Sequence, residues 1–316
     1  MFSKIESLVP KAFVWRRLHS LLGLWIVIYL IEHLIVNSQA ALWIGNDGAG
    51  FVRMVNAIQH LPYLQVIESM FIGIPIVFHG FLGLKYVFQA KSNAYTYSPK
   101  QPSLRYERNQ AYSWQRLTSW ILIVGIGLHV VQMRFIDKPY KLLRDNQYEY
   151  LVKLKFDPGL LTLADRLHVE IFQKEVIEKY KKQKIQVIST SFVNSKETGV
   201  EAQQDRERMQ WILGLSSFHL SEHQVVAAAK NPGTAILLTT RDTFKSPFMD
   251  ILYTFFVLAA VYHAFNGCWV FLNTWGILLN IRSQRAMVPI SYAFMLLFLF
   301  LGLAAIWGSY WINLRS

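Results

Sequence analysis

The chain is poor in cysteine and in charge. Its 316 residues include one cysteine, Cys268, and only 16% of them are charged, whereas 53% are hydrophobic. A single cysteine excludes an intrachain disulfide framework, an iron–sulfur site held by this chain alone and the Cys-x-x-Cys-His attachment of a c-type haem. The low charge and high apolar content exclude an ordinary soluble domain and indicate an integral membrane protein.

Five long apolar stretches occur along the chain. A bilayer core needs about 20 mainly apolar residues in a helix to be crossed, so each stretch predicts one membrane-spanning helix. The stretches are 21–38, 66–88, 117–133, 249–279 and 290–314. The expected fold class is an all-α membrane protein of five transmembrane helices, with a small α/β extramembrane insertion between helices three and four. The expected domains are residues 1–136, the insertion 137–247, and residues 248–316.

Within the insertion, the sequence patterns predict both helices and strands. Apolar residues recur at helical spacing over 163–184, and 220–230 is also expected to be a helix that ends before the turn signal Asn231-Pro232-Gly233. Short runs rich in β-branched and apolar residues predict strands over 185–193 and 235–240. The insertion is therefore expected to be a small α/β domain.

The basic residues of the short connections predict the orientation of the chain, because loops rich in lysine and arginine stay in the cytoplasm. Three segments are rich in them, namely the N-terminal segment and the second and fourth connections: Lys4, Lys11, Arg16, Arg17, Lys91, Lys100, Arg105, Arg108, Arg116, Arg282 and Arg285. The connection after the first stretch has only Arg53, which Asp47 offsets. The N-terminus is therefore expected in the cytoplasm, with the insertion and the C-terminus outside.

The net charge of +12 fits the same orientation. The insertion has 17 basic and 14 acidic residues, so most of the excess charge lies on the connections expected in the cytoplasm. Lipid headgroups and the positive-inside rule account for this charge, and no nucleic-acid partner is expected.

One histidine lies in each of four apolar stretches: His33, His79, His129 and His263. An ionisable residue in a lipid-spanning helix is costly, so each one is a candidate functional residue. Four of them on separate helices favour axial ligation of two haems in a four-helix bundle over isolated interhelical hydrogen bonds. Since both axial positions of each iron would be filled by histidine, the haems would serve electron transfer rather than substrate chemistry.

The depth of each histidine predicts which ones pair. At about 1.5 Å per helical residue, His33 and His129 lie about 5 Å below the expected outer boundary, and His79 and His263 lie about 20 Å below it. Helices that run in the same direction therefore carry their histidine at the same level. The expected pairs are His33 with His129 for an outer haem and His79 with His263 for an inner haem.

Small and polar residues near these histidines add further candidates. Three of the histidines have a glycine one helical turn away, namely Gly83, Gly125 and Gly267. These glycines would either clear space for a flat porphyrin or allow close helix packing. His19 and Ser20, at the expected cytoplasmic edge, would either bind a propionate of the inner haem or lie at the interface as ordinary residues.

Several motifs around the histidines are shared with a known family. They are Arg16-Arg17-Leu18-His19-Ser20-Leu21-Leu22-Gly23, Glu32-His33-Leu34-Ile35-Val36-Asn37, Val77-Phe78-His79-Gly80, Gln115-Arg116-Leu117-Thr118, Phe265-Asn266-Gly267-Cys268-Trp269, Thr274-Trp275-Gly276 and Arg282-Ser283-Gln284-Arg285. On these residues the chain resembles the Bacillus-type, five-helix, di-haem cytochrome b subunit that anchors succinate:quinone oxidoreductases in the membrane. The resemblance covers residues 10–136 and 248–316, and the insertion has no counterpart in it.

The resemblance implies cofactors, partners and a location. It implies two haem b groups with the same paired axial ligands, and inner propionates near His19 and Ser20. It implies a flavoprotein subunit and an iron–sulfur subunit on the cytoplasmic side of a bacterial inner membrane, with FAD and the iron–sulfur clusters only in those partners. A membrane quinone, menaquinone by family type, is the implied electron acceptor.

The expected function is therefore the membrane anchor and electron-transfer subunit of a succinate dehydrogenase. The chain alone would not oxidise succinate, because it has neither a dinucleotide fingerprint nor iron–sulfur cysteines. One alternative is the anchor of a quinol:fumarate reductase, although Val261 stands where related anchors carry a carboxylate. Others are a di-haem b subunit of another quinone-linked dehydrogenase, such as a formate dehydrogenase or hydrogenase, and a haem-free transporter or scaffold.

Overall fold

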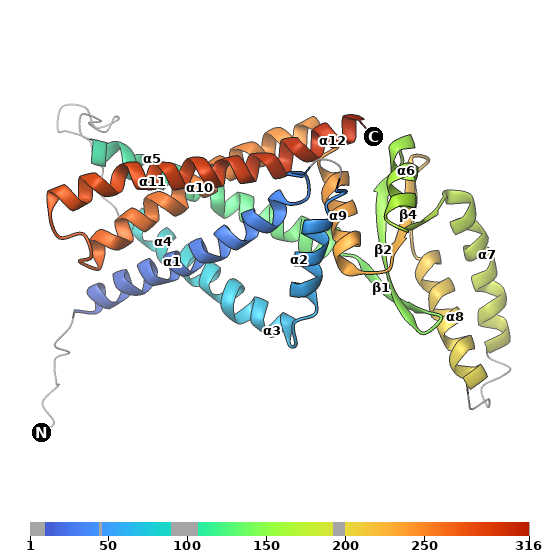
Figure 1. Ribbon diagram of the computed structural model, residues 1–316. Helices are drawn as coiled ribbons and strands as arrows, with labels where there is room; N and C mark the ends of the chain where they lie inside the picture. The colour runs from blue at the N-terminus through green and yellow to red at the C-terminus, as the bar shows by residue number, and fades with distance from the viewer. Residues whose placement is uncertain (1–9, 44–45, 90–106, 192–199, 316) are drawn as a thin grey trace, which may run out of the picture. The chain divides into compact units, whose positions relative to one another are not determined.

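The computed structural model describes residues 10–43, 46–89, 107–191 and 200–315. The chain divides into two compact units, and most of their helices and strands are labelled in Figure 1. Unit 1 comprises Met1–Ile35, Pro62–Leu128 and Leu252–Leu303, and unit 2 comprises Val36–Leu61, His129–Ile251 and Ala304–Ser316. Some residues on which the expected orientation depends lie outside the described part of the chain: Lys4, Lys91, Lys100 and Arg105.

Five helices among these residues are long and apolar enough to cross a membrane, and each includes most of one predicted stretch. They are Lys11–Ser38, Leu64–Gln89, Gln110–Ile136, Pro247–Thr274 and Ile281–Leu314. Four of them are longer than the stretches that predicted them. The fourth, α10, ends at Thr274, before the predicted limit, because Gly276 adopts φ 71 and closes the helix. The N–H of Ile277 then donates to the carbonyl oxygen of Leu272 at 2.9 Å, as in a Schellman cap.

Three of the five spans contain π-helical turns. The second consists of α3 (Leu64–Glu68), η1 (Ser69–Gly73) and α4 (Ile74–Gln89), and the third of α5 (Glu107–Val130) and η2 (Val131–Ile136). The fifth consists of α11 (Ile281–Leu303), η3 (Ala304–Gly308) and α12 (Ser309–Arg315). The first and fourth spans are α1 (Lys11–Ser38) and α10 (Pro247–Thr274).

The wide turn η1 has its cause in Pro75. Proline lacks an N–H, and its ring would clash with the carbonyl group four residues earlier, that of Phe71. A π-helical turn relieves such a clash. The freed carbonyl oxygen of Phe71 accepts a hydrogen bond from the indole Nε1 of Trp25 at 2.6 Å, which joins α1 to the second span.

Unit 2 contains a four-stranded antiparallel sheet in the order β1-β2-β4-β3. Its strands are β1 (Tyr140–Arg144), β2 (Gln147–Lys155), β3 (Glu170–Phe172) and β4 (Gln224–Ala229). Strands β1 and β2 form a hairpin whose two turn residues, Asp145 and Asn146, have φ 50 and 62. Two such left-handed residues are what a type I′ hairpin turn needs.

Helices cover both faces of this sheet. Helices α6 (Pro158–Arg166) and α9 (Pro232–Thr243) pack on one face, where Val225 and Ala227 of β4 meet Leu163 and Leu238. Helices α7 (Lys174–Ser191) and α8 (Val200–Ser216) pack on the other face, where Val226 and Ala228 meet Ile177 and Trp211. The insertion is thus a mixed helix-and-sheet structure, as the sequence predicts.

The far side of α9 packs against α2 (Ala49–Gln59), a helix that is not predicted from the sequence. Leu237 of α9 is fully buried there with Phe51 and Val55, and Val36 at the end of α1 joins the cluster. Because one side of α9 faces the sheet and the other faces α2, nearly all of its side chains are buried or half-buried.

Several predicted elements of the insertion are wrong. The expected helix 220–230 is strand β4, because a central strand buried on both faces has the same continuous apolar run as a buried helix. The expected strand 235–240 lies in α9, since Asn231 and Pro232 start a helix there. The expected helix 163–184 is split into α6, β3 and α7, and α7 extends through most of the expected strand 185–193, whose last two residues lie outside the described part.

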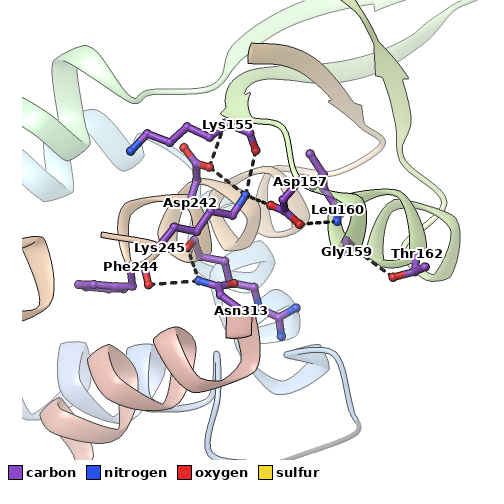
Figure 2. Close-up of polar contacts among 10 residues, drawn as sticks. Lys155, Asp157, Gly159, Leu160, Thr162, Asp242, Phe244, Lys245 and Asn313 are labelled. Carbon is purple, nitrogen blue, oxygen red and sulfur yellow. Dashed lines mark hydrogen bonds and ion pairs between the residues drawn. The ribbon is translucent and has the colours of Figure 1, made fainter. Parts of the chain in front are cut away.

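A polar junction around Lys245 joins the end of β2 to helices α6 and α9 in unit 2 (Figure 2). The Lys245 ammonium lies 2.5 Å from Asp157 Oδ2 and 3.2 Å from Asp242 Oδ1, and it donates to the carbonyl oxygen of Lys155 at 2.9 Å. Asp157 also caps the start of α6 by accepting from the N–H of Leu160 at 2.9 Å. The end of β2, the start of α6 and the end of α9 are fixed at one point.

Candidate haem-binding site

Three of the candidate histidines form a cluster in unit 1. His19 of α1 and His79 of α4 stack their rings in parallel, with centroids 4.1 Å apart and planes 8° apart. The ring of His263, from α10, stands nearly perpendicular to that of His79, at a centroid distance of 6.3 Å and an angle of 85°. The structure therefore brings together the two residues predicted as the inner haem ligands.

The distance between His79 and His263 fits two ligands of one iron. An imidazole nitrogen binds a metal ion at about 2 Å, and the ring centroid lies about 1 Å behind that nitrogen, so two imidazoles on opposite sides of one iron have centroids roughly 6 Å apart. The observed 6.3 Å agrees with that value. Packing alone would not require this separation, since His79 and His19 approach to 4.1 Å.

The hydrogen bond of His79 fixes its tautomer. Its Nδ1 lies 3.0 Å from the main-chain carbonyl oxygen of His19. A carbonyl oxygen can only accept, so Nδ1 carries the proton and donates it. The neutral ring then presents the lone pair of Nε2, which is the form that binds a metal ion.

His263 has the same arrangement with a different partner. Its Nδ1 lies 3.2 Å from the hydroxyl of Thr118 on α5. The Thr118 hydroxyl lies 2.8 Å from the carbonyl oxygen of Trp114 and 3.1 Å from that of Gln115, so its single proton is directed to the helix backbone. The hydroxyl therefore accepts from His263 Nδ1, which leaves Nε2 unprotonated.

A second contact from α5 holds the backbone of His263. The side-chain amide of Gln115 donates to the carbonyl oxygen of His263 at 3.1 Å. Asn266, one turn further along α10, donates to the amide oxygen of Gln115 at 2.6 Å. Gln115 thus lies between two groups of α10 and fixes α5 and α10 at the level of His263.

Two buried polar atoms beside His79 have no hydrogen-bond partner among the described residues. They are Nε2 of His19 and the hydroxyl of Tyr86, whose ring stands edge-on to His19 at 5.4 Å. A buried polar group without a partner is costly, so such atoms mark a place where a polar ligand group would be bound. Their position beside a candidate axial ligand fits a haem propionate, and Ser20 follows His19 on the same helix in a half-buried position.

The other expected pair, His33 and His129, is divided between the two units. His33 lies in unit 1, and its Nδ1 is 3.4 Å from the hydroxyl of Tyr29, one turn earlier on α1. His129 lies in unit 2 at the C-terminal end of α5 and is half-buried. The pairing of these two residues stays a prediction.

The three glycines near the histidines differ in their surroundings. At Gly125 an added Cβ would lie 2.5 Å from the ring of Phe256 on α10, so this glycine serves close packing of helices. At Gly83 the neighbour is Nε2 of His19, 3.4 Å from an added Cβ, and at Gly267 it is the amide nitrogen of Gln115 at 3.7 Å. Only the position of Gly125 is filled by a large side chain of another helix.

No role is predicted from the sequence for Gln115, Thr118 or Tyr86, although Gln115 and Thr118 lie in one of the motifs shared with the known family. A signal for two of them exists in the sequence. Gln115 and Thr118 are polar, three residues apart and at the start of an apolar stretch, so they share one face of a helix. Their partner could not be read from this spacing, because it lies on α10.

Comparison with known proteins relates part of the chain to a cytochrome subunit. Over 125 residues, or 39% of its length, the chain is 35% identical to the succinate dehydrogenase cytochrome b558 subunit of Bacillus subtilis (strain 168). The chain spans only 56% of the length of that relative. Neither a family model nor a solved structure matches the chain.

Proposed function

We propose that the chain is the membrane anchor and electron-transfer subunit of a succinate dehydrogenase, and that it binds two b-type haems. The observation that carries this proposal is the pair His79 and His263, whose rings are 6.3 Å apart and whose Nδ1 atoms are both engaged by acceptors. When bound, each haem would be held by two histidines and would supply one-electron redox chemistry. The likeness to a succinate dehydrogenase cytochrome b558 subunit supports the same assignment.

The residues of the chain have separate roles in this proposal. His79 and His263 hold the inner haem, and His33 and His129 hold the outer one. His19, with Ser20 beside it, binds a propionate of the inner haem through the buried Nε2 that lacks a partner among the described residues. The helices would exclude water from the ligands, and the acceptors at Nδ1 set the tautomer that leaves Nε2 of both imidazoles free to bind iron.

The proposal also assigns partners and an orientation. The chain has no dinucleotide fingerprint and one cysteine, so succinate oxidation requires a flavoprotein subunit and an iron–sulfur subunit. These subunits would dock on the cytoplasmic side, where the basic connections lie. A membrane quinone, expected to be menaquinone, would receive the electrons near the outer surface, in a bacterial inner membrane.

The first prediction concerns haem content. The purified complex should contain two haem b groups per chain, seen in a reduced-minus-oxidised spectrum. His263→Ala should remove the inner haem and leave the outer one, because only the inner iron loses a ligand. His129→Ala should do the reverse. His219→Ala, at an exposed loop histidine of unit 2, is the matched control and should keep both haems.

Two results would contradict the proposal in different ways. Fewer than about one haem per chain in the wild type would end the di-haem assignment. Haem at the expected level with a molybdenum or nickel subunit in place of a flavoprotein would assign the chain to a formate dehydrogenase or hydrogenase instead.

A further inference from the structure

The Nδ1 atoms of His79 and His263 have different kinds of hydrogen-bond acceptor. His79 donates to a main-chain carbonyl oxygen, which no substitution of a side chain removes. His263 donates to the hydroxyl of Thr118, a side chain from another helix. One ligand of the pair is therefore set by the backbone, and the other depends on a single residue.

Thr118 is suited to this role by its burial and by its own hydrogen bonds. Its exposure is 6%, so water does not compete for Nδ1 of His263. Its proton is directed to the carbonyl oxygens of Trp114 and Gln115, so the hydroxyl oxygen is left to accept from Nδ1 of His263. Isolated Thr residues often bond in this way to the preceding turn of their own helix. Here the hydroxyl has a second, interhelical partner.

Gln115 makes a second contact between α5 and His263. It lies one turn before Thr118 on α5, and its amide nitrogen donates to the carbonyl oxygen of His263. Its amide oxygen is engaged by Asn266, which fixes which end of the amide faces His263. The main chain and the ring of His263 are thus both held from α5.

We propose that Thr118 and Gln115 are positioning residues that clamp His263, and that Thr118 tunes the reduction equilibrium of the inner haem. This inference rests on the proposed function, since it needs a haem at His79 and His263. An acceptor at Nδ1 makes the coordinating nitrogen more basic, which favours the oxidised iron over the reduced iron. Loss of the acceptor therefore favours reduction of the inner haem.

The test compares Thr118→Val with Thr118→Ser in the purified complex. Valine keeps the shape but removes the acceptor, whereas serine keeps the hydroxyl. A redox titration followed by haem absorbance should show the inner haem of Thr118→Val reduced more easily, by about tenfold in the equilibrium, or about 59 mV for one electron. The outer haem should titrate as in the wild type, and Thr118→Ser should restore the wild-type value for the inner one.

Other outcomes decide between the tuning role, a plain structural role and failure of the proposed function. Loss of the inner haem from Thr118→Val, with retention in Thr118→Ser, would support the clamp, because partners of metal ligands commonly contribute 10- to 100-fold in affinity. An unchanged inner titration in Thr118→Val, or an equal shift of both haems, would overturn the inference and leave the proposed function standing. If Thr118→Val does not accumulate, Thr118→Ala provides the same comparison. A haem-free wild type would overturn both proposals.

Discussion

At the scale of single residues, burial in unit 2 disfavours the charged form of the Glu149 carboxylate. Arg144 on β1 lies 2.6 Å from Glu170 and 3.7 Å from Glu149, so one guanidinium is shared between two carboxylates. Burial raises the pKa of Glu149 above its ordinary value, Arg144 opposes that shift, and Glu170 adds to it. One oxygen of Glu149 is buried without a hydrogen-bond partner among the described residues.

The raised pKa of Glu149 predicts a pH dependence. A carboxyl with a raised folded pKa contributes stability while it is protonated, and that contribution is lost as pH rises from the ordinary pKa through the folded one. Glu149→Gln should therefore stabilise the β1–β2 hairpin at neutral pH by about 0.5 kcal/mol, a value kept small by solvent screening. Below the ordinary glutamate pKa the variant and the wild type should be equally stable.

Hydrogen–deuterium exchange of the β1–β2 amides tests this effect, since a comparison at equal pH cancels the intrinsic exchange rate. Glu222→Gln is the control, because Glu222 is an exposed residue outside the strands. The prediction would have the wrong sign if the gain in protection of Glu149→Gln over the wild type were larger at acidic pH than at neutral pH.

The candidate histidines could be singled out from the sequence, but the contacts that hold them could not. A histidine inside an apolar stretch is costly enough to stand out by itself. The spacing of Thr118 and Gln115 places them on one helix face but does not identify their partner, because His263 is about 145 residues further along the chain and only the packing of α5 on α10 brings it near. The stacking of His19 on His79 also depends on the packing of two helices.

At the scale of elements, α9 shows how a local cap and a tertiary contact combine. Asn231 caps the helix by accepting from the N–H of Thr234 at 2.9 Å, and Pro232 occupies the first turn. The same oxygen of Asn231 accepts from the amide of Asn56 on α2 at 3.1 Å, and Asn56 accepts from the N–H of Gly233 at 2.7 Å. The β-branched content of 235–240 favours a strand, but these caps and the burial of both sides of α9 determine a helix.

This double use of Asn231 predicts a loss of stability on its removal. Asn231→Ala would lose the helix cap and the bond from Asn56, and it should lower the stability of unit 2 by about 1–2 kcal/mol. Asn231→Asp keeps an acceptor oxygen for both partners and should stay close to the wild type. Thermal unfolding of the purified complex, with exchange protection of α9 as the local measure, compares them. Equal protection of α9 in the alanine and aspartate variants would contradict the assigned role.

At the scale of the whole molecule, unit 2 collects three separate parts of the chain. It contains the connection after α1, the long insertion and the C-terminal end of the last span. Contacts within the unit join them: the buried Arg241 of α9 donates to the carbonyl oxygen of Ala40, and Asn313 of α12 donates to the carbonyl oxygen of Arg241. Arg166 also pairs with Asp47 at 2.9 Å.

The composition of unit 2 can be compared with the predicted number of membrane spans. With five spans, the first connection, the third connection and the C-terminus must all lie on one side, and these are the segments that unit 2 contains. A single compact unit therefore agrees with an odd number of spans. The fold does not identify that side, and the basic residues predict that it is the exterior.

Cysteine labelling in intact cells would test on which side of the membrane unit 2 lies. In a Cys268→Ser background, Arg53→Cys on α2 and Lys179→Cys on α7 are exposed positions of unit 2, and Arg282→Cys at the start of α11 is an exposed position of the fourth connection. A membrane-impermeant thiol reagent should label the cysteines at positions 53 and 179 and leave that at 282 unlabelled until the cells are opened. Labelling of position 282 alone would reverse the orientation and place unit 2 in the cytoplasm. Different results for 53 and 179 would contradict a unit that lies on one side, because α2 and the insertion pack together in it through α9.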